Sequence, residues 1–265
     1  MGNQTGRIIR RLKKMGDSEI AAHSQRFFKT GKGEYAEGDI FLGIRVPDLR
    51  KCAREFRDIR IDDALELLSS HLHEARLLAL FILVAKYASG NSDEKDEIYH
   101  SYLIHMEYIN NWDLVDCSAE HIVGAQLFNG DRKPIYRLAG SKNMWERRIA
   151  IMSTFHFIKK NHFSDTLALA GMLLNDREDL IHKAVGWMLR EIGKRDLRTE
   201  EKFLIKFYRK MPAQCCVMPS KNSPRLKDRP TCKGPDRYSP PEESADLIMQ
   251  DPDGKSLSHA ATFPG

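Results

Sequence analysis

Residues 143–160 read NMWERRIAIMSTFHFIKK, and apolar side chains return along this stretch every three or four positions. An α-helix turns once in about 3.6 residues, so this spacing places the apolar side chains on one face. The stretch therefore predicts an amphipathic helix over residues 143–160 that packs against a protein core. The positions that carry this prediction are Met144, Ile149, Met152, Phe155 and Ile158.

The same helical period continues on both sides of this stretch, from about Ser18 to Met211, with short polar breaks and no convincing strand pattern. Pro47 stands at a first-turn position, Asp176 precedes another helical run, and Gly193 follows that run as a stop signal. Further helices are predicted to begin near Pro47, Asp62, Glu74, Ser164 and Asp179.

Helices joined by short turns at a spacing of about 40 residues indicate HEAT-like repeats, which stack into a superhelical solenoid with a concave surface. We therefore predict an all-α fold of the ARM/HEAT type, an α–α superhelix. Identity between the repeats is weak, so a compact helical bundle stays open as an alternative.

The composition changes after Pro212, because 8 of the 11 prolines fall in residues 213–265 and the apolar period ends there. We expect a folded domain over residues 1–212 and a disordered tail over residues 213–265. Permitted codons for the first part of the tail, read in another frame, restore a helical period. Our hypothesis is a frameshift near Pro212, and the alternative is an ordinary disordered extension.

The chain has a formal net charge of +5, and residues 1–212 hold the whole excess, with 35 Lys and Arg against 30 Asp and Glu. A mild positive excess favours a polyanionic partner such as nucleic acid, although a mixed charged surface also serves solubility alone.

Several classes of site and location are excluded by pattern. The five cysteines have no CxxC spacing, so neither a disulfide framework nor a zinc site is indicated. No HExxH, GxGxxG or phosphate-loop motif occurs, and we expect no metal and no cofactor. No run approaches the length of about 18 apolar residues that a membrane helix needs, and the basic start lacks the apolar segment of a secretion signal. We expect a cytoplasmic protein.

Three segments place a tryptophan beside an ionisable group at helical spacing, and they contain every tryptophan of the chain. Trp112 and Asp116 are four residues apart in NNWDLVD, and Trp145 precedes Arg148 by three in MWERR. In HKAVGWMLRE, Trp187 follows a lysine by four residues and precedes an arginine by three. The alternative for each segment is that the tryptophan packs in the core and the charge is solvated.

Together with one further segment, these stretches resemble the AlkD family of HEAT-like DNA alkylation-repair glycosylases. The resemblance covers residues 1–212 in order and implies a DNA glycosylase that acts on alkylated double-stranded DNA as a monomer. The segments that carry it are FLGIRVPDLRK (41–51), NNWDLVD (110–116), MWERRIAI (144–151) and IHKAVGWMLREIGK (181–194).

The resemblance implies a role for four residues. Trp112 is similar to the tryptophan that packs on the deoxyribose beside the lesion, and Asp116 to the catalytic carboxylate. Arg148 is similar to the arginine that holds the phosphate of the damaged nucleotide, and Trp187 to the second aromatic wall. The implied reaction is hydrolysis of the N-glycosidic bond of N3-methyladenine and N7-methylguanine in base excision repair.

Other basic residues are candidates for DNA phosphate contacts, although lysine and arginine ordinarily form the solvated faces of helices. Two further function classes stay open: a noncatalytic HEAT-like protein that binds distorted or branched DNA, and a helical-repeat scaffold for protein interactions. The phosphate-contact candidates are Arg45, Arg50, Lys51, Arg76, Arg147, Arg148, Lys183 and Arg190.

Overall fold

The computed structural model describes residues 4–207 and residue 211. Every regular secondary-structure element within these residues is a helix. The only β-pairing among them is an isolated parallel bridge between Ile40 and Leu72. The all-α prediction is therefore confirmed for the described residues. The predicted disordered tail, residues 213–265, lies outside the described residues, and so does the proposed frameshift.

Among the described helices, none combines the length and the apolar character needed to cross a membrane.

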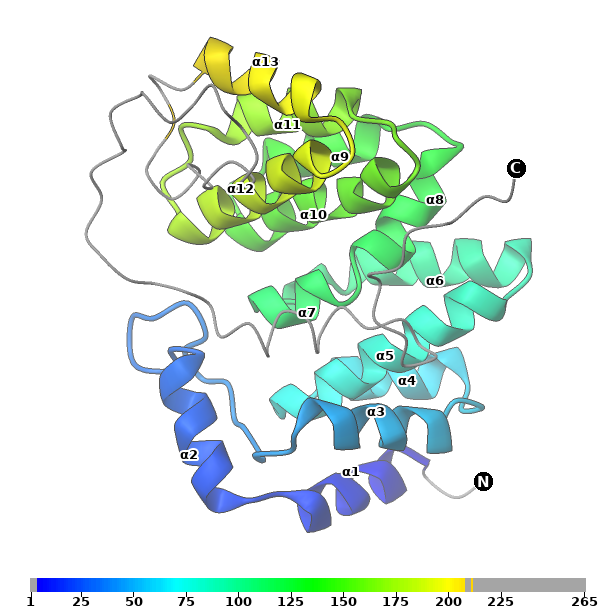
Figure 1. Ribbon diagram of the computed structural model, residues 1–265. Helices are drawn as coiled ribbons and strands as arrows, with labels where there is room; N and C mark the ends of the chain where they lie inside the picture. The colour runs from blue at the N-terminus through cyan, green and yellow to red at the C-terminus, as the bar shows by residue number, and fades with distance from the viewer. Residues whose placement is uncertain (1–3, 208–210, 212–265) are drawn as a thin grey trace, which may run out of the picture. The chain divides into compact units, whose positions relative to one another are not determined.

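The chain divides into two compact units, whose described parts are residues 4–89 and residues 90–207 with 211. In the first unit, α3 and α4 both pack against α5, and α1 packs against α4 and α5 (Figure 1). This order of contacts is that of an α-helical repeat, as predicted. The helices are α1 (Gln4–Met15), α2 (Ser18–Phe27), α3 (Val46–Glu55), α4 (Ile61–Leu68) and α5 (His73–Ser89).

Helix α1 was not predicted from the sequence, because the predicted helical region began only at about Ser18. The segment is rich in Arg and Lys, so its apolar stripe is short. Ile8 and Leu12 are nevertheless fully buried, each with 0% of its surface exposed, and they lie one turn apart on the face of α1 that packs on the rest of the unit.

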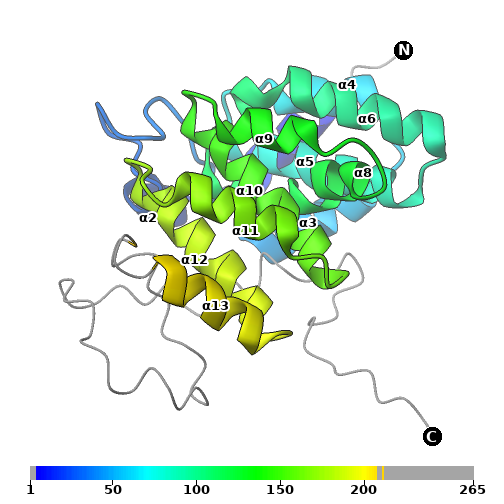
Figure 2. The same cartoon turned by 90° about the horizontal axis from the view of Figure 1, so that it is seen from above.

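In the second unit, α10 is the central element. It packs against α7, η2, α9, α11 and α12, and α12 also packs against α13 (Figures 1 and 2). The elements are α6 (Ser92–Ile104), the 3₁₀-helix η1 (Met106–Tyr108), α7 (Trp112–Asp116), the π-helix η2 (Glu120–Gly124), α8 (Ala125–Phe128), α9 (Lys133–Ala139), α10 (Met144–Lys159), α11 (Ser164–Leu173), α12 (Asp179–Gly193) and α13 (Leu197–Phe207).

Helix α10 confirms the helix predicted over residues 143–160. The side chain of Asn143 caps its start by accepting a hydrogen bond from the backbone N of Trp145 at 2.9 Å. Ile149, Phe157 and Ile158 are completely buried and point to different sides of the helix. Helix α10 is buried on several sides because other helices of the unit pack around it.

Two features fix the segment after α7 against α10. A Cβ atom at Gly124 would lie 2.2 Å from the backbone oxygen of Ser153, so only glycine allows η2 and α10 to approach this closely. Lys159 of α10 also pairs with the buried Glu120 of η2 at 2.5 Å. The close approach and the ion pair set the distance between α10 and the chain that leaves α7.

A buried carboxylate orders the loop ahead of α3. Glu74, in the first turn of α5, accepts hydrogen bonds from the backbone N atoms of Leu42, Gly43 and Ile44 at distances from 2.7 to 3.2 Å. Gly43 has a φ of +80°, which favours glycine at this position. The loop ends at Arg45, which is the residue immediately before α3.

Candidate functional site

The short helix α7 carries the first two candidate residues of the second unit. The Asn111 side chain caps this helix by accepting a hydrogen bond from the backbone N of Trp112 at 2.8 Å. Because α7 is little more than one turn long, Trp112 and Asp116 lie on the same face. Asp116 is 5% exposed, whereas Trp112 is half-buried. Trp112 is thus more exposed than the carboxylate that shares its helix face.

Buried polar groups support α7 from behind. The hydroxyls of Tyr102 and Ser118 share a hydrogen bond of 2.9 Å, and Ser118 donates to the backbone oxygen of Leu114 at 2.6 Å. These contacts hold the last turn of α7, and with it Asp116, in one orientation.

Asp116 and Arg148 form a buried bidentate ion pair between α7 and α10. Arg148 donates from Nε to Oδ1 at 2.9 Å and from Nη2 to Oδ2 at 2.8 Å, and its Nη1 donates to the backbone oxygen of Leu180. Each of the two paired side chains is 6% exposed. The arginine therefore connects the candidate carboxylate to the first turn of α12.

The surroundings of Asp116 set its acidity in opposing directions. Burial raises the pKa of this carboxyl, the Arg148 guanidinium lowers it through charge and hydrogen bonds, and the nearby carboxylate of Asp113 raises it again. The resulting pKa lies above the ordinary value of 3.8. Asp116 is thus a better proton acceptor than an ordinary aspartate, while the bidentate pair favours its ionised form.

Helix α12 carries the third group of candidates. Lys183 and Trp187 are four residues apart and share a face, and both Lys183 and Arg190 are exposed. Trp187 is half-buried, and its ring lies 6.2 Å from the ring of Phe155 on α10, measured between centroids. Phe155 follows Arg148 by two helical turns, so Trp187 packs along the same side of α10 that carries the ion pair.

Arg147, the neighbour of Arg148, is engaged with a different carboxylate. It donates from Nε to Oδ2 of Asp176 at 2.6 Å and from Nη2 to Oδ1 at 2.9 Å. Its Nη1 donates to the backbone oxygens of Ser141 and Lys142, each at 3.0 Å. The predicted phosphate contact of Arg147 is untested, and four of the five N–H groups of its guanidinium already have protein acceptors.

The first unit holds the remaining phosphate-contact candidates, and only some of them are exposed. Arg45 is exposed at the start of α3, and the exposed Lys51 pairs with Asp48 at 2.9 Å. The guanidinium of the half-buried Arg50 lies 4.5 Å from the centre of the Phe81 ring.

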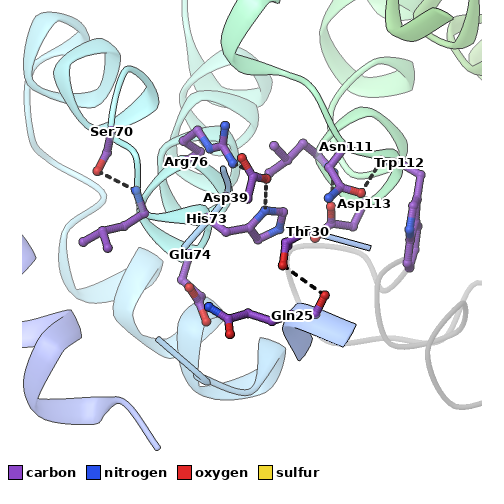
Figure 3. A network of polar contacts seen from close by, with 12 residues as sticks. Gln25, Thr30, Asp39, Ser70, His73, Glu74, Arg76, Asn111, Trp112 and Asp113 are labelled. Carbon is purple, nitrogen blue, oxygen red and sulfur yellow. Dashed lines mark hydrogen bonds and ion pairs between the residues drawn. The ribbon is translucent and has the colours of Figure 1, made fainter. Parts of the chain in front are cut away.

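Arg76 differs from these three because it is 4% exposed. It pairs with the buried Asp39 at 2.6 Å, and His73 contacts the same carboxylate at 3.4 Å (Figure 3). The imidazole of His73 in turn stacks on Phe41, with 4.2 Å between ring centroids. The phosphate contact predicted for Arg76 is likewise untested, and the guanidinium lies inside the unit.

The second unit thus brings four predicted residues onto three helices that meet at α10: Trp112 and Asp116 on α7, Arg148 on α10 and Trp187 on α12. Trp145, the third tryptophan, is instead 7% exposed and packs in the core, as the alternative for its segment predicted.

From the sequence alone, no functional role was assigned to two residues that contact the candidates. Asp176 binds Arg147, and Phe155 packs against Trp187. Asp176 lies 29 residues from Arg147, and no spacing rule links positions that far apart. Phe155 was correctly placed on the apolar face of α10, but its contact with Trp187 depends on how α10 and α12 pack. Within the described residues, no group of three or more His, Cys, Asp and Glu side chains is placed to bind a metal ion.

Comparisons with known proteins bear on the family and the fold of this chain. A family model described as DNA alkylation repair enzyme matches residues 8–216. A solved structure described as a predicted DNA alkylation repair enzyme from Enterococcus faecalis superposes with a TM-score of 0.60, covering 80% of this chain and 98% of that chain at 16% identity. At that identity the likeness shows the fold alone. No curated protein matches the sequence. Because the family match spans most of the chain, this protein belongs to the DNA alkylation repair enzyme family, and its role lies in the repair of alkylated DNA.

Proposed function

We propose that this protein is a DNA glycosylase that hydrolyses the N-glycosidic bond of cationic alkylated purines, with N3-methyladenine and N7-methylguanine as substrates. The observation that carries the proposal is the buried Asp116–Arg148 pair, which joins α7 to α10 in a unit that also presents the half-buried indoles of Trp112 and Trp187. A carboxylate, a guanidinium and two aromatic faces are the groups that this reaction needs.

Asp116 has the properties of the group that acts at the sugar. Departure of the base leaves positive charge on the deoxyribose, and a fixed carboxylate in a site of low dielectric stabilises such charge strongly. The raised pKa of Asp116 also favours its action as a general base toward the attacking water. Both roles need the ionised carboxylate.

In this proposal Arg148 binds a phosphate while it keeps its pair with Asp116. Its hydrogen bonds to Asp116 and Leu180 use Nε, one N–H of Nη1 and one N–H of Nη2. Each terminal nitrogen carries a second N–H, and guanidinium groups bind phosphate oxygens through such pairs. In this proposal Arg148 links the DNA backbone to the carboxylate that acts on the neighbouring sugar.

The two indoles account for the preference for charged lesions. Aromatic faces attract cations, so Trp112 and Trp187 stabilise both a cationic base and the cationic sugar that its departure creates. A base that already carries positive charge leaves without being protonated, and the proposed mechanism therefore uses no general acid. Neutral lesions should accordingly be poor substrates.

One observation favours a second candidate, a noncatalytic protein that binds distorted DNA. The Asp116 carboxylate already accepts two hydrogen bonds from Arg148, and a carboxylate whose only task is to fix an arginine would look the same. In that case the exposed Lys183 and Arg190 would provide DNA affinity without chemistry.

Release of methylated bases from alkylated duplex DNA tests the proposal. We expect release of N3-methyladenine or N7-methylguanine well above the spontaneous rate, and little release of the neutral base hypoxanthine from inosine-containing DNA. Binding that weakens steeply with salt, with no release of any methylated base, would instead favour the noncatalytic binder. Absence of DNA binding would contradict both readings.

A further inference from the structure

Arg147 and Arg148 are consecutive on α10, and both reach toward the segment at the start of α12. Arg148 donates to the backbone oxygen of Leu180 in the first turn of α12. Arg147 binds Asp176, just ahead of that helix, and Asp176 accepts a hydrogen bond from the backbone N of Glu178 at 3.0 Å. The start of α12 is therefore attached to α10 at two successive points.

We propose that Arg147 and Asp176 form a positioning pair, which sets α12 on α10 so that Trp187 faces the site of Asp116. The inference rests on the proposed glycosylase function, and it reassigns Arg147 from a DNA phosphate contact to a residue that acts through the protein.

The contacts of Arg147 support this role. Its guanidinium crosses from the backbone of Ser141 and Lys142, ahead of α10, to the carboxylate of Asp176, ahead of α12. The two paired side chains are only 15% and 5% exposed. One side chain therefore connects the loops that precede two packed helices, and a bidentate pair permits little rotation between them.

The remaining donors point the same way. Four of the five N–H groups of Arg147 have protein acceptors, whereas Arg148 keeps a second N–H on each of its two terminal nitrogens. A phosphate that took over the guanidinium would leave Asp176 largely buried without its partner, which is costly. Lys183 offers the contrast, because it is exposed on the face of α12 that also carries Trp187. Lys183 is therefore the better phosphate contact.

A shift of α12 should affect the chemical step more than binding. Trp187 lies about two turns along the helix from the attachment point, so loosening its start displaces the indole relative to Asp116. Misplacement of a site group by about 1 Å can lower a rate by about 100-fold. DNA affinity, which depends mainly on phosphate contacts, should change little.

The test compares Asp176→Asn, Arg147→Gln and the double variant with Lys183→Ala as the matched control. Each is studied under single-turnover conditions on DNA that contains N7-methylguanine, at a temperature where circular dichroism shows it to be folded. Affinity is measured against a duplex with a tetrahydrofuran abasic analogue, over a range of salt concentrations.

We expect both single variants to lower the maximal release rate by about 10-fold or more, with unchanged half-saturation and an unchanged salt slope. The double variant should be no slower than the slower single variant, because both changes remove the same contact. Lys183→Ala should instead weaken binding and reduce the salt slope by about one.

The opposite pattern would overturn the inference. If Arg147 contacts a phosphate, Arg147→Gln will reduce the salt slope by about one, and Asp176→Asn will strengthen binding by removing a competing carboxylate. Wild-type release rates in folded Asp176→Asn would also contradict it. If the wild-type protein releases no base, the proposed function fails, and the salt slopes alone then decide whether Arg147 contacts DNA.

Discussion

The two units of the molecule each contain a buried aspartate–arginine pair, and the pairs differ in what surrounds them. Asp39 and Arg76 of the first unit lie 2.6 Å apart, and Asp116 and Arg148 of the second lie 2.8 Å apart. All four side chains are at most 6% exposed. Distance and burial therefore do not distinguish the pair that we propose to be catalytic from the pair in the first unit.

The acidity of the two carboxyls does distinguish them. Burial raises the pKa of Asp39, but His73 and Arg76 outweigh that effect and the pKa lies below its ordinary value. Burial raises the pKa of Asp116 as well, and Arg148 does not outweigh it, partly because Asp113 adds a second negative charge. Asp39 has two partners that stabilise its charge, whereas Asp116 has a single partner and a like-charged neighbour.

The difference teaches that two buried pairs with similar distances can hold carboxyls whose pKa values shift in opposite directions, because their other neighbours differ in charge. A cationic sugar beside Asp116 would supply the compensation that the protein lacks. Asp39 has no such deficit, and we infer that its pair with Arg76 anchors the start of α5.

The largest effect on stability is expected for Asp39→Asn. This change removes the buried carboxylate with which Arg76 pairs at 2.6 Å, and breaking a buried pair by removing one partner costs about 3 to 5 kcal/mol. We expect that loss in the free energy of unfolding, measured by urea denaturation, with hydrogen exchange rising first in α5. The proposed chemistry should be unaffected in the protein that remains folded.

The matched control is Asp48→Asn in the same unit. Its pair with Lys51 is solvent-exposed on both sides, so the change should cost less than about 1 kcal/mol. Equal losses for Asp39→Asn and Asp48→Asn would show that the buried pair is not an anchor.

A second prediction separates the two pairs by pH. Asp116 can act only when ionised, so base release should decline as the pH falls through its raised pKa, by about tenfold per pH unit. The stability from Asp39 is fully present above the pKa of the unfolded chain and is lost only as the pH falls through its lowered folded pKa. The release rate should therefore decline at a pH where the first unit is still stable.

Single-turnover release from about pH 8 to about pH 4.5, corrected for spontaneous depurination, would show this order, with circular dichroism recorded in the same buffers. A release rate that stays constant until the fold itself is lost would contradict the raised pKa of Asp116 as the controlling group.

Much of the fold could be predicted from local pattern. The helix at residues 143–160 was found almost to the residue, because a long apolar period leaves few alternatives. Helix α3 begins one residue before Pro47, and α12 ends at Gly193, so the local signals for helix ends also succeeded. Helix α1 was missed because Ile8 and Leu12 form only a short apolar stripe among basic residues.

The candidate site was predictable in part, for a different reason. Trp112 and Asp116 are close in sequence, so helical geometry alone places them together. The ion pair of Asp116 with Arg148, 32 residues away, depends on packing that no local pattern encodes. The same limit made Arg76 and Arg147 look like solvent-exposed cations, although their partners at Asp39 and Asp176 lie 37 and 29 residues away.

The most direct test of the central claim is the single-turnover release of N7-methylguanine by the wild-type protein, Asp116→Asn and Asp39→Asn, at a temperature where all three are folded. We predict that Asp116→Asn loses at least about 100-fold in rate, because the carboxylate acts on the developing charge. Asp39→Asn should release the base at close to the wild-type rate. Wild-type activity in Asp116→Asn, or equal losses in both variants, would contradict the assignment of Asp116 as the catalytic carboxylate.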